Sequence, residues 1–212
     1  MVRKIDSKSA ITHRFRLPSA KNDSTVTSES TLEHQLALRL EYTPSIFAFQ
    51  EQPATYQVPF DGKVINVTPD FKVTWDPELA LAPEFIEVKP SRRAKKERVS
   101  ARLDAAKHYI EDLGFTYVVL TEQDIQRSKQ VIQNCNFLNP FKWQSRNRAE
   151  QLRDLAPSQP VPCSKWAETV GDVQLVIEMI AHQLVFCDFY QPLTPDTVIR
   201  PLQDGDFAYM YA

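Results

Sequence analysis

The segment from residue 46 to residue 89 constrains the fold most, because it consists of short strand-like runs separated by turns. Residues 70–75 alternate between polar and apolar side chains, and this period of two places the two sets on opposite faces of a sheet. Asp61-Gly62 provides a hairpin turn earlier in the segment, and residues 85–89 form another apolar run after it. We therefore predict several antiparallel strands here.

Helical patterns flank this block of strands. A first helix begins at Ser30, whose hydroxyl caps it while Glu33 closes a capping box, and it ends at Thr43-Pro44. A second amphipathic helix is expected from residue 91 to about residue 113. The run 117–120 is apolar without alternation, which is typical of a strand covered on both faces. This order predicts an α/β fold built around a mixed sheet that is flanked by helices.

The two ends of the chain have a different texture. Residues 1–28 are polar and rich in Ser and Thr, so we predict a mobile N-terminal arm with one short ordered piece around residues 15–17. The mixed α/β domain then covers residues 29–125. Residues 126–212 combine helical patches near 122–134 and 143–155, further short helices and a tail that could form a hairpin. That pattern predicts a small, mostly helical C-terminal domain and is compatible with a winged-helix module.

Composition excludes several classes of function. The 212 residues include 4 Gly, and no Gly-rich loop that cradles phosphate is present. The 3 Cys are far apart, which gives neither a disulfide framework nor zinc-ligand spacing and fits a reducing interior. No apolar run approaches the ~18 residues of a membrane span. The formal net charge of −2 argues against a protein that coats DNA non-specifically.

Positive charge is nevertheless concentrated in one place, directly after the run 85–89. Between Lys89 and Arg102 a single acid interrupts the basic residues. A run of this kind is either the solvated start of a helix or a site for the DNA backbone. The candidate DNA-binding residues are Arg92, Arg93, Lys95, Lys96, Arg98 and Arg102.

A possible metal site lies on the predicted strands. Glu87 and Lys89 are two residues apart, so their side chains leave the same face while Val88 points into the core. If the strands at 70–75 and 85–89 pair antiparallel, Asp70 approaches Glu87. Two close carboxylates repel one another, and a hard divalent cation is the usual way to satisfy them. We predict Mg²⁺ bound by Asp70, Glu87 and the Val88 carbonyl, with Glu33 adding a direct or water-mediated contact.

Lys89 completes this candidate site. Its ammonium would contact the attacking water or the charge that develops on phosphorus, which stabilises the transition state. Simpler interpretations remain open, because Glu87 and Lys89 could form a strand salt bridge and Glu33 could be a helix cap alone. The order of helix Glu, then Asp, then Glu-x-Lys, then a basic helix favours the catalytic interpretation of Glu33, Asp70, Glu87 and Lys89.

These motifs resemble the PD-(D/E)xK nucleases, in Glu33, Thr68-Pro69-Asp70 and the run 85–90. The fuller set resembles the TnsA family, the endonuclease subunit of heteromeric cut-and-paste transposases. It adds the Ser30-x-x-Glu33 helix start, the segment 49–53 (Phe-Gln-Glu-Gln-Pro) and the ending Lys89-Pro90 before a basic helix. The resemblance covers about residues 28–125.

The resemblance implies a restriction-endonuclease-like fold and a definite reaction. The protein would hydrolyse the non-transferred strand at each transposon end with Mg²⁺, for which Mn²⁺ could substitute, leaving a 5′-phosphate and a 3′-hydroxyl. A DDE transposase of the TnsB type would cut the other strand, and the C-terminal domain would bind an AAA+ regulator of the TnsC type. Carried over by position, Glu33, Asp70 and Glu87 would be metal-binding acids and Lys89 the catalytic lysine. The implied location is the bacterial cytoplasm, on the nucleoid when active.

Two other functions remain open on the sequence. The same chemistry could belong to a free-standing restriction or repair nuclease, which would cut DNA without partner proteins. The chain could also be a non-catalytic adaptor that bridges transposase and regulator, although the acids and the lysine are all present.

Overall fold

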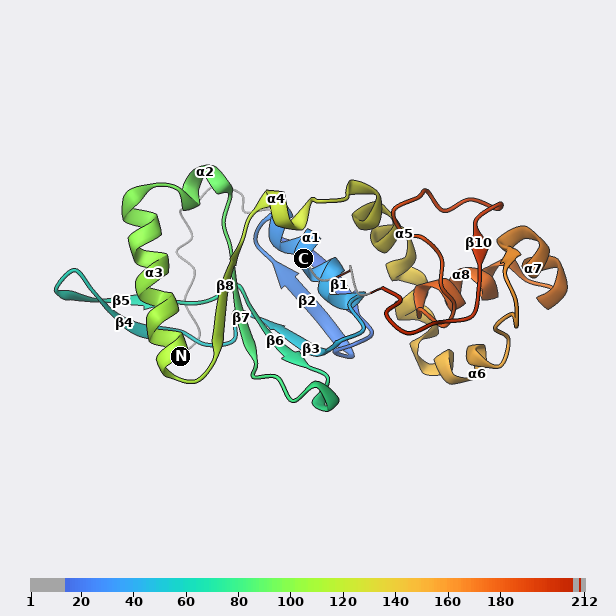
Figure 1. Cartoon of the computed structure of the whole chain (residues 1–212), viewed down its shortest axis with the longest axis horizontal. Coiled ribbons are helices and arrows are strands. Elements are labelled where there is room, and N and C mark those ends of the chain that lie inside the picture. The colour runs from blue at the N-terminus through green and yellow to red at the C-terminus, as the bar shows by residue number, and fades with distance from the viewer. Residues whose placement is uncertain (1–13, 208–209, 211–212) are drawn as a thin grey trace.

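A four-stranded mixed sheet forms the centre of the computed structural model, which describes residues 14–207 and residue 210 (Figure 1). The strand order is β3-β6-β7-β8, with antiparallel pairing except between β7 and β8, which run parallel. The strands are β3 (Ile46–Glu51), β6 (Phe71–Trp75), β7 (Glu84–Val88) and β8 (Thr116–Leu120). The predicted α/β fold with a mixed sheet flanked by helices is confirmed, and it is restriction-endonuclease-like.

Each face of the sheet has its own hydrophobic cluster. Ile86 and Val88 point to the face covered by α1 (Thr31–Glu41). Phe85 and Tyr117 point to the opposite face, where α3 (Glu97–Asp112) packs together with the hairpin of β4 (Tyr56–Phe60) and β5 (Lys63–Val67). Figure 1 shows α3 and the projecting β4–β5 hairpin at one end of the molecule. The alternation of β7 therefore sends Glu87 to the α3 face.

The basic helix differs from its prediction. We predict one helix over residues 91–113, whereas the structure has α2 (Ser91–Ala94) and α3, with a break at Lys95 and Lys96. Lys96 has an extended backbone with φ −72° and ψ 126°. Arg92 lies three residues before Lys95 and four before Lys96, and Arg93 lies three before Lys96. Like charges at these spacings destabilise a continuous helix.

The N-terminal segment is more ordered than predicted. β1 (Phe15–Ser19) and β2 (Ser24–Ser28) form an antiparallel hairpin, and Leu17 and Val26 are buried in the core beside α1. The ordered piece predicted around residues 15–17 is part of β1, whereas the prediction of a mobile arm is wrong for residues 18–28. Residues 1–13 lie outside the described residues. The few apolar residues among Ser and Thr hid the strand pattern, although Thr favours strands.

The C-terminal region is mostly helical, as predicted. Its helices are α5 (Lys129–Ser145), α6 (Ala149–Arg153), α7 (Cys163–Val170) and α8 (Val173–Ala181), with a short 3₁₀ turn at Arg146–Arg148 between α5 and α6. The short helix α4 (Glu122–Ile125) precedes this region, and a second 3₁₀ turn, Pro77–Leu79, lies before β7. The helix α5 continues through Pro140, across the gap between the two patches that we predicted. The tail strand β10 (Val198–Ile199) pairs with β9 (Val161–Pro162), so it does not form the hairpin expected within the tail.

The boundary at residue 125 does not separate two hydrophobic cores. Leu40 of α1, Leu138 of α5 and Met179 of α8 belong to the same buried cluster. The division into domains at that residue stays a prediction, while the packing shows that the two regions share a core. Among the described residues, no helix is both long and apolar enough to cross a membrane.

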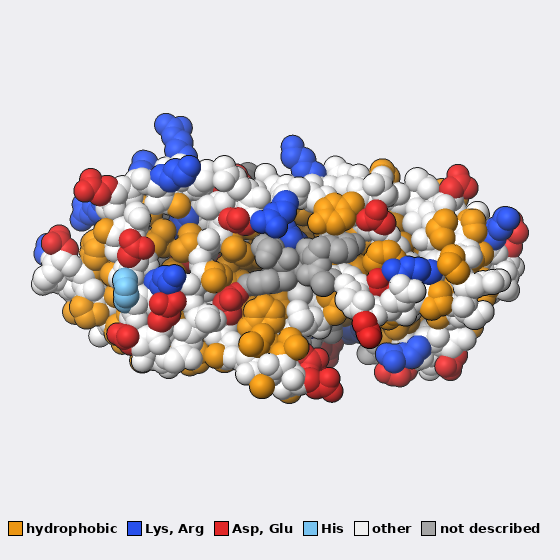
Figure 2. All heavy atoms as spheres, in the orientation of Figure 1, with side chains coloured by type: hydrophobic (Ala, Val, Ile, Leu, Met, Phe, Trp, Pro, Cys, Tyr) orange, Lys and Arg blue, Asp and Glu red, His pale blue; other side chains and the backbone are white. Residues whose placement is uncertain are grey.

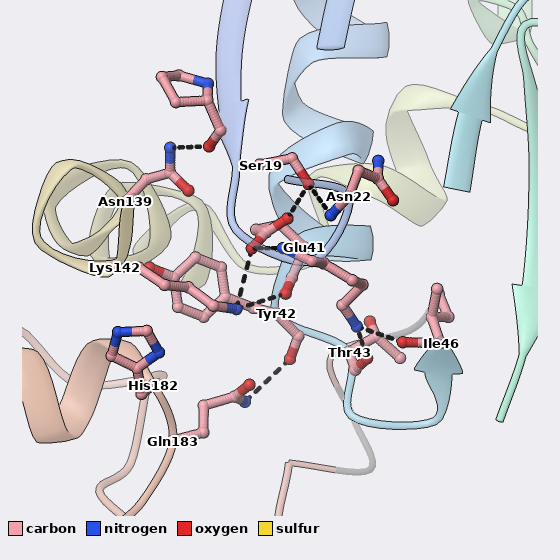
Figure 3. A network of polar contacts seen from close by, with 12 residues as sticks. Ser19, Asn22, Glu41, Tyr42, Thr43, Ile46, Asn139, Lys142, His182 and Gln183 are labelled. Carbon is pink, nitrogen blue, oxygen red and sulfur yellow. Dashed lines mark hydrogen bonds and ion pairs between the residues drawn. The ribbon is translucent and has the colours of Figure 1, made fainter. Parts of the chain in front are cut away.

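A buried polar network also joins the two regions (Figure 3). The fully buried carboxylate of Glu41, at the end of α1, accepts a hydrogen bond from Ser19 Oγ at 2.6 Å. Lys142 of α5 brings its Nζ to 3.1 Å from Glu41 Oε1 and donates to the Glu41 backbone carbonyl at 2.8 Å. The same ammonium lies 4.4 Å from the centre of the Tyr42 ring. The nuclease-like part and the C-terminal part are thus held by a buried ion pair as well as by apolar contacts.

Candidate active site

Asp70 and Glu87 are brought together by the pairing of β6 with β7. The register pairs Phe71 with Ile86, so Asp70, just before β6, lies at the next position along, opposite Glu87. The backbone of Asp70 is fixed because its carbonyl accepts a hydrogen bond from Gln52 N at 2.9 Å. Its carboxylate is fixed as well, because Oδ2 accepts from Val88 N at 2.7 Å. Both carboxylates therefore lie at one end of the two central strands, where β6 begins and β7 ends.

The ammonium group of Lys89 lies between these acids. Its Nζ is 2.5 Å from Glu87 Oε1 and 3.8 Å from Asp70 Oδ2, and it donates to the Val88 carbonyl at 3.2 Å. The Lys89 side chain is 31% exposed, whereas those of Asp70 and Glu87 are 16% and 10% exposed. The site is therefore a half-buried cluster with its positive group nearest to solvent.

Burial and like charge perturb the pKa of Asp70 strongly. Burial, followed by the neighbouring Glu87 carboxylate, raises the pKa of Asp70 to about 7, although Lys89 opposes this shift. Burial alone would lower the pKa of Lys89, but the carboxylates of Asp70 and Glu87 outweigh it and raise that pKa. A strongly perturbed carboxyl beside a charged partner, at the edge of a sheet, is typical of a functional site.

Glu33 does not join the cluster. Its Oε1 accepts from Ser30 Oγ at 2.7 Å and its Oε2 accepts from Glu29 N at 2.8 Å, so the carboxylate serves the start of α1. It still acts at longer range, because its charge adds to the rise in the pKa of both Asp70 and Lys89. The structure therefore brings two of the three predicted carboxylates together, while the carboxylate of Glu33 is hydrogen-bonded to Ser30 Oγ and Glu29 N.

The chemistry of the remaining donors still suits a hard divalent cation. Two carboxylates and a backbone carbonyl are oxygen ligands, which Mg²⁺ prefers. Glu87 Oε2 is buried and has no hydrogen-bond partner within the described part of the chain. No group of three His, Cys, Asp or Glu side chains suited to a metal occurs among residues 14–207 and 210.

The candidate DNA-binding residues are all exposed. They line α2, the break after it and the first turns of α3, directly beyond Lys89: Arg92, Arg93, Lys95, Lys96, Arg98 and Arg102. Figure 2 shows Lys and Arg side chains projecting from the edge of the molecule that carries α2. One of the six is also structural, because the guanidinium of Arg102 donates to the Asn66 carbonyl of β5 at 2.7 Å.

Gln52 has a role at the site that sequence reasoning did not identify. It has a positive φ of 42° and directs its backbone N–H to the carbonyl of Asp70. The signal was present in the Gln-Glu-Gln-Pro motif at residues 50–53, which we used only for the resemblance. In the structure this motif forms a sharp turn after β3, and the hydrogen bond from Gln52 N fixes the backbone of Asp70.

The mixed sheet flanked by helices has a restriction-endonuclease-like fold, and the clustered acids lie at the ends of its central strands. Residues 43–122 match the family model described as "TnsA-like endonuclease N terminal", a match that covers less than half of the chain. This part of the chain is therefore similar to the N-terminal domain of TnsA-like endonucleases. A comparison with curated proteins found no match. The family match includes Asp70, Glu87 and Lys89 but begins after Glu33.

Proposed function

We propose that this protein is a Mg²⁺-dependent endonuclease that cuts the non-transferred strand at transposon ends, leaving a 5′-phosphate and a 3′-hydroxyl. One observation carries the proposal. Within the TnsA-like segment, the two carboxylates of Asp70 and Glu87 and the carbonyl of Val88 all surround the ammonium of Lys89. Oxygen ligands beside a fixed cation are what phosphodiester hydrolysis requires.

Asp70, Glu87 and the Val88 carbonyl would hold the metal. Mg²⁺ bound there would polarise a phosphate oxygen and make water a better nucleophile at neutral pH. Mn²⁺ has similar ligand preferences and would substitute. Glu33 would contribute negative charge from its place at the start of α1, as its effect on the pKa of Asp70 and Lys89 supports.

Lys89 would stabilise charge on the reacting phosphate. Its raised pKa keeps the ammonium charged at neutral pH, and its partial exposure leaves it accessible to DNA. Because Lys89 contacts all three candidate metal ligands, the ammonium and a divalent ion compete for the same oxygens. Metal binding would therefore release Lys89 toward the substrate.

The basic residues of α2 and α3 would hold the DNA backbone beside this site. Phosphate contacts of Lys and Arg position a protein on a duplex without reading its sequence. The net charge of −2 predicts weak binding by the isolated protein. Partner proteins, a DDE transposase of the TnsB type and an AAA+ regulator of the TnsC type, would then bring the nuclease to the transposon ends, which limits cutting elsewhere.

A strand-resolved cleavage assay tests the proposal. Transposon-end duplexes labelled separately on each strand are incubated with the full chain and both partners, with Mg²⁺ or with a chelator. We expect the non-transferred strand to be cut only when the full chain, both partners and Mg²⁺ are present, while the transposase cuts the other strand. Cutting by the full chain alone would favour a free-standing nuclease. Unchanged cutting by the full complex carrying Asp70→Ala would favour the adaptor.

Replacing Lys89 by methionine should separate metal binding from chemistry. Loss of the competing ammonium should tighten Mn²⁺ binding by about tenfold, whereas loss of a positive charge at the phosphate should slow cleavage by about 10²-fold or more. Titration calorimetry at pH 8.5, above the Asp70 pKa of about 7, measures the first effect, and single-turnover cleavage at saturating metal measures the second. Weaker Mn²⁺ binding in Lys89→Met would contradict the competition.

A further inference from the structure

Two buried polar atoms near the site lack hydrogen-bond partners among the described residues. One is Glu87 Oε2, the carboxylate oxygen that does not pair with Lys89. The other is the hydroxyl of Tyr117 on β8. Tyr117 is 2% exposed and Glu87 is 8% exposed. A buried donor or acceptor without a partner costs about 1–3 kcal/mol, so two such atoms in one place call for an explanation.

The strand register places these two side chains on the same face. In the parallel pair of β7 and β8, Phe85 lies opposite Tyr117 and Glu87 lies opposite Val119. Because side chains alternate along each strand, Phe85, Glu87 and Tyr117 all point toward α3. Tyr117 is then the diagonal neighbour of Glu87, a spacing of roughly 7–8 Å between backbones that an aromatic side chain can span.

The electrostatics agree with this proximity. Burial, followed by the carboxylates of Glu87 and Asp70, raises the pKa of Tyr117. Tyr117 is thus the aromatic hydroxyl that the two acids of the site influence, and a phenol is in any case protonated at neutral pH and able to donate.

We propose that Tyr117 is a positioning residue of the nuclease site, whose hydroxyl donates to Glu87 Oε2 and holds Oε1 toward Lys89 and the metal. This inference rests on the proposed function. The two oxygens of Glu87 then have different roles. Oε1 contacts Lys89 and would face the metal, and Oε2 is held by Tyr117 in the core between β8 and α3. Groups that orient a metal ligand in this way typically change metal affinity or activity by 10–100-fold when removed.

The variant Tyr117→Phe tests the inference, because it removes the hydroxyl and keeps the ring that packs against the α3 cluster. We expect Mn²⁺ affinity of the full chain, measured by calorimetry, to fall about tenfold, with cleavage falling in parallel. Tyr109→Phe is the matched control: Tyr109 belongs to the same cluster, its ring packs against Tyr56, and its replacement should leave Mn²⁺ affinity unchanged. Mn²⁺ affinity of Tyr117→Phe within twofold of the parent would overturn the inference.

A second measurement needs neither metal nor DNA. In protein labelled with ¹³C at the tyrosine Cζ, the Tyr117 signal should shift when Glu87 is replaced by glutamine, while the Tyr109 signal stays in place. If the chemical shift of the Tyr117 signal did not change in Glu87→Gln, the hydrogen bond between Tyr117 and Glu87 would be refuted. If the parent protein bound no Mn²⁺, the proposed function would fail, and this spectroscopic result would still decide whether Tyr117 holds Glu87.

Discussion

The variant Asp70→Asn should lose DNA cutting, with a rate at least about 10³-fold below that of the parent protein. Asparagine is the informative replacement because its side-chain oxygen can still accept the hydrogen bond from Val88 N, which Asp70 accepts at 2.7 Å. Alanine would leave that buried N–H without a partner and confuse catalysis with folding. Single-turnover cleavage of strand-labelled transposon ends, with both partner proteins present, measures the loss.

The same variant should be more stable than the parent in the absence of metal. The pKa of the Asp70 carboxyl is 3.8 in its ordinary state and about 7 in the fold, so the native protein binds more protons between these values. Its stability therefore falls as the pH rises from about 4 to about 7, and the full cost is present above 7. At pH 8 with chelator, we expect urea unfolding to show Asp70→Asn more stable by about 1–3 kcal/mol, with little difference near pH 4.

Two controls make this result decisive. Asp154→Asn makes the same chemical change at an exposed position outside the site. It should leave the cutting rate unchanged and should alter the free energy of unfolding by no more than about 0.5 kcal/mol. Added Mg²⁺ should stabilise the parent and not Asp70→Asn, because only the parent keeps both carboxylates. Cutting by Asp70→Asn within tenfold of the parent would exclude Asp70 from the chemistry.

The central sheet was predictable because its signals are local. Alternation in residues 70–75 and the apolar run 117–120 each fix a strand, and capping by Ser30 fixes the start of α1. The antiparallel pairing of β6 with β7 was a condition of the sequence argument, and the structure meets it, which brings Asp70 opposite Glu87. The alternation of strand residues placed Glu87 and Lys89 on one face.

The features that the sequence did not reveal depend on partners distant along the chain. Glu33 could satisfy either the helix start or a metal, and only the structure shows its carboxylate bonded to Ser30 and Glu29. Tyr117 resembles an ordinary core residue until the register places it diagonal to Glu87. The β1–β2 hairpin carries too few apolar residues for a strand prediction and is stabilised by packing on α1.

A second large effect should follow from the buried network that joins the two regions of the chain. Replacing Lys142 by methionine keeps most of the apolar stem but leaves the Glu41 carboxylate, which is fully buried, without its cation. The nearby Lys21 donates its backbone N–H to Glu41 Oε1, but its Nζ donates to the carbonyls of Thr43 and Ile46. Breaking one half of a buried pair typically costs 3–5 kcal/mol, so we expect Lys142→Met to be destabilised by about that amount in urea unfolding.

Combining the change with Glu41→Gln should recover part of the loss, because a neutral amide costs less than a buried unpaired carboxylate and can still accept from Ser19 Oγ. The exposed pair of Lys107 and Glu111, at 3.8 Å on α3, is the matched comparison: Lys107→Met should cost no more than about 1 kcal/mol. If the double variant were less stable than Lys142→Met alone, the loss would come from packing of α5, and the ion pair would not be what holds the two regions together.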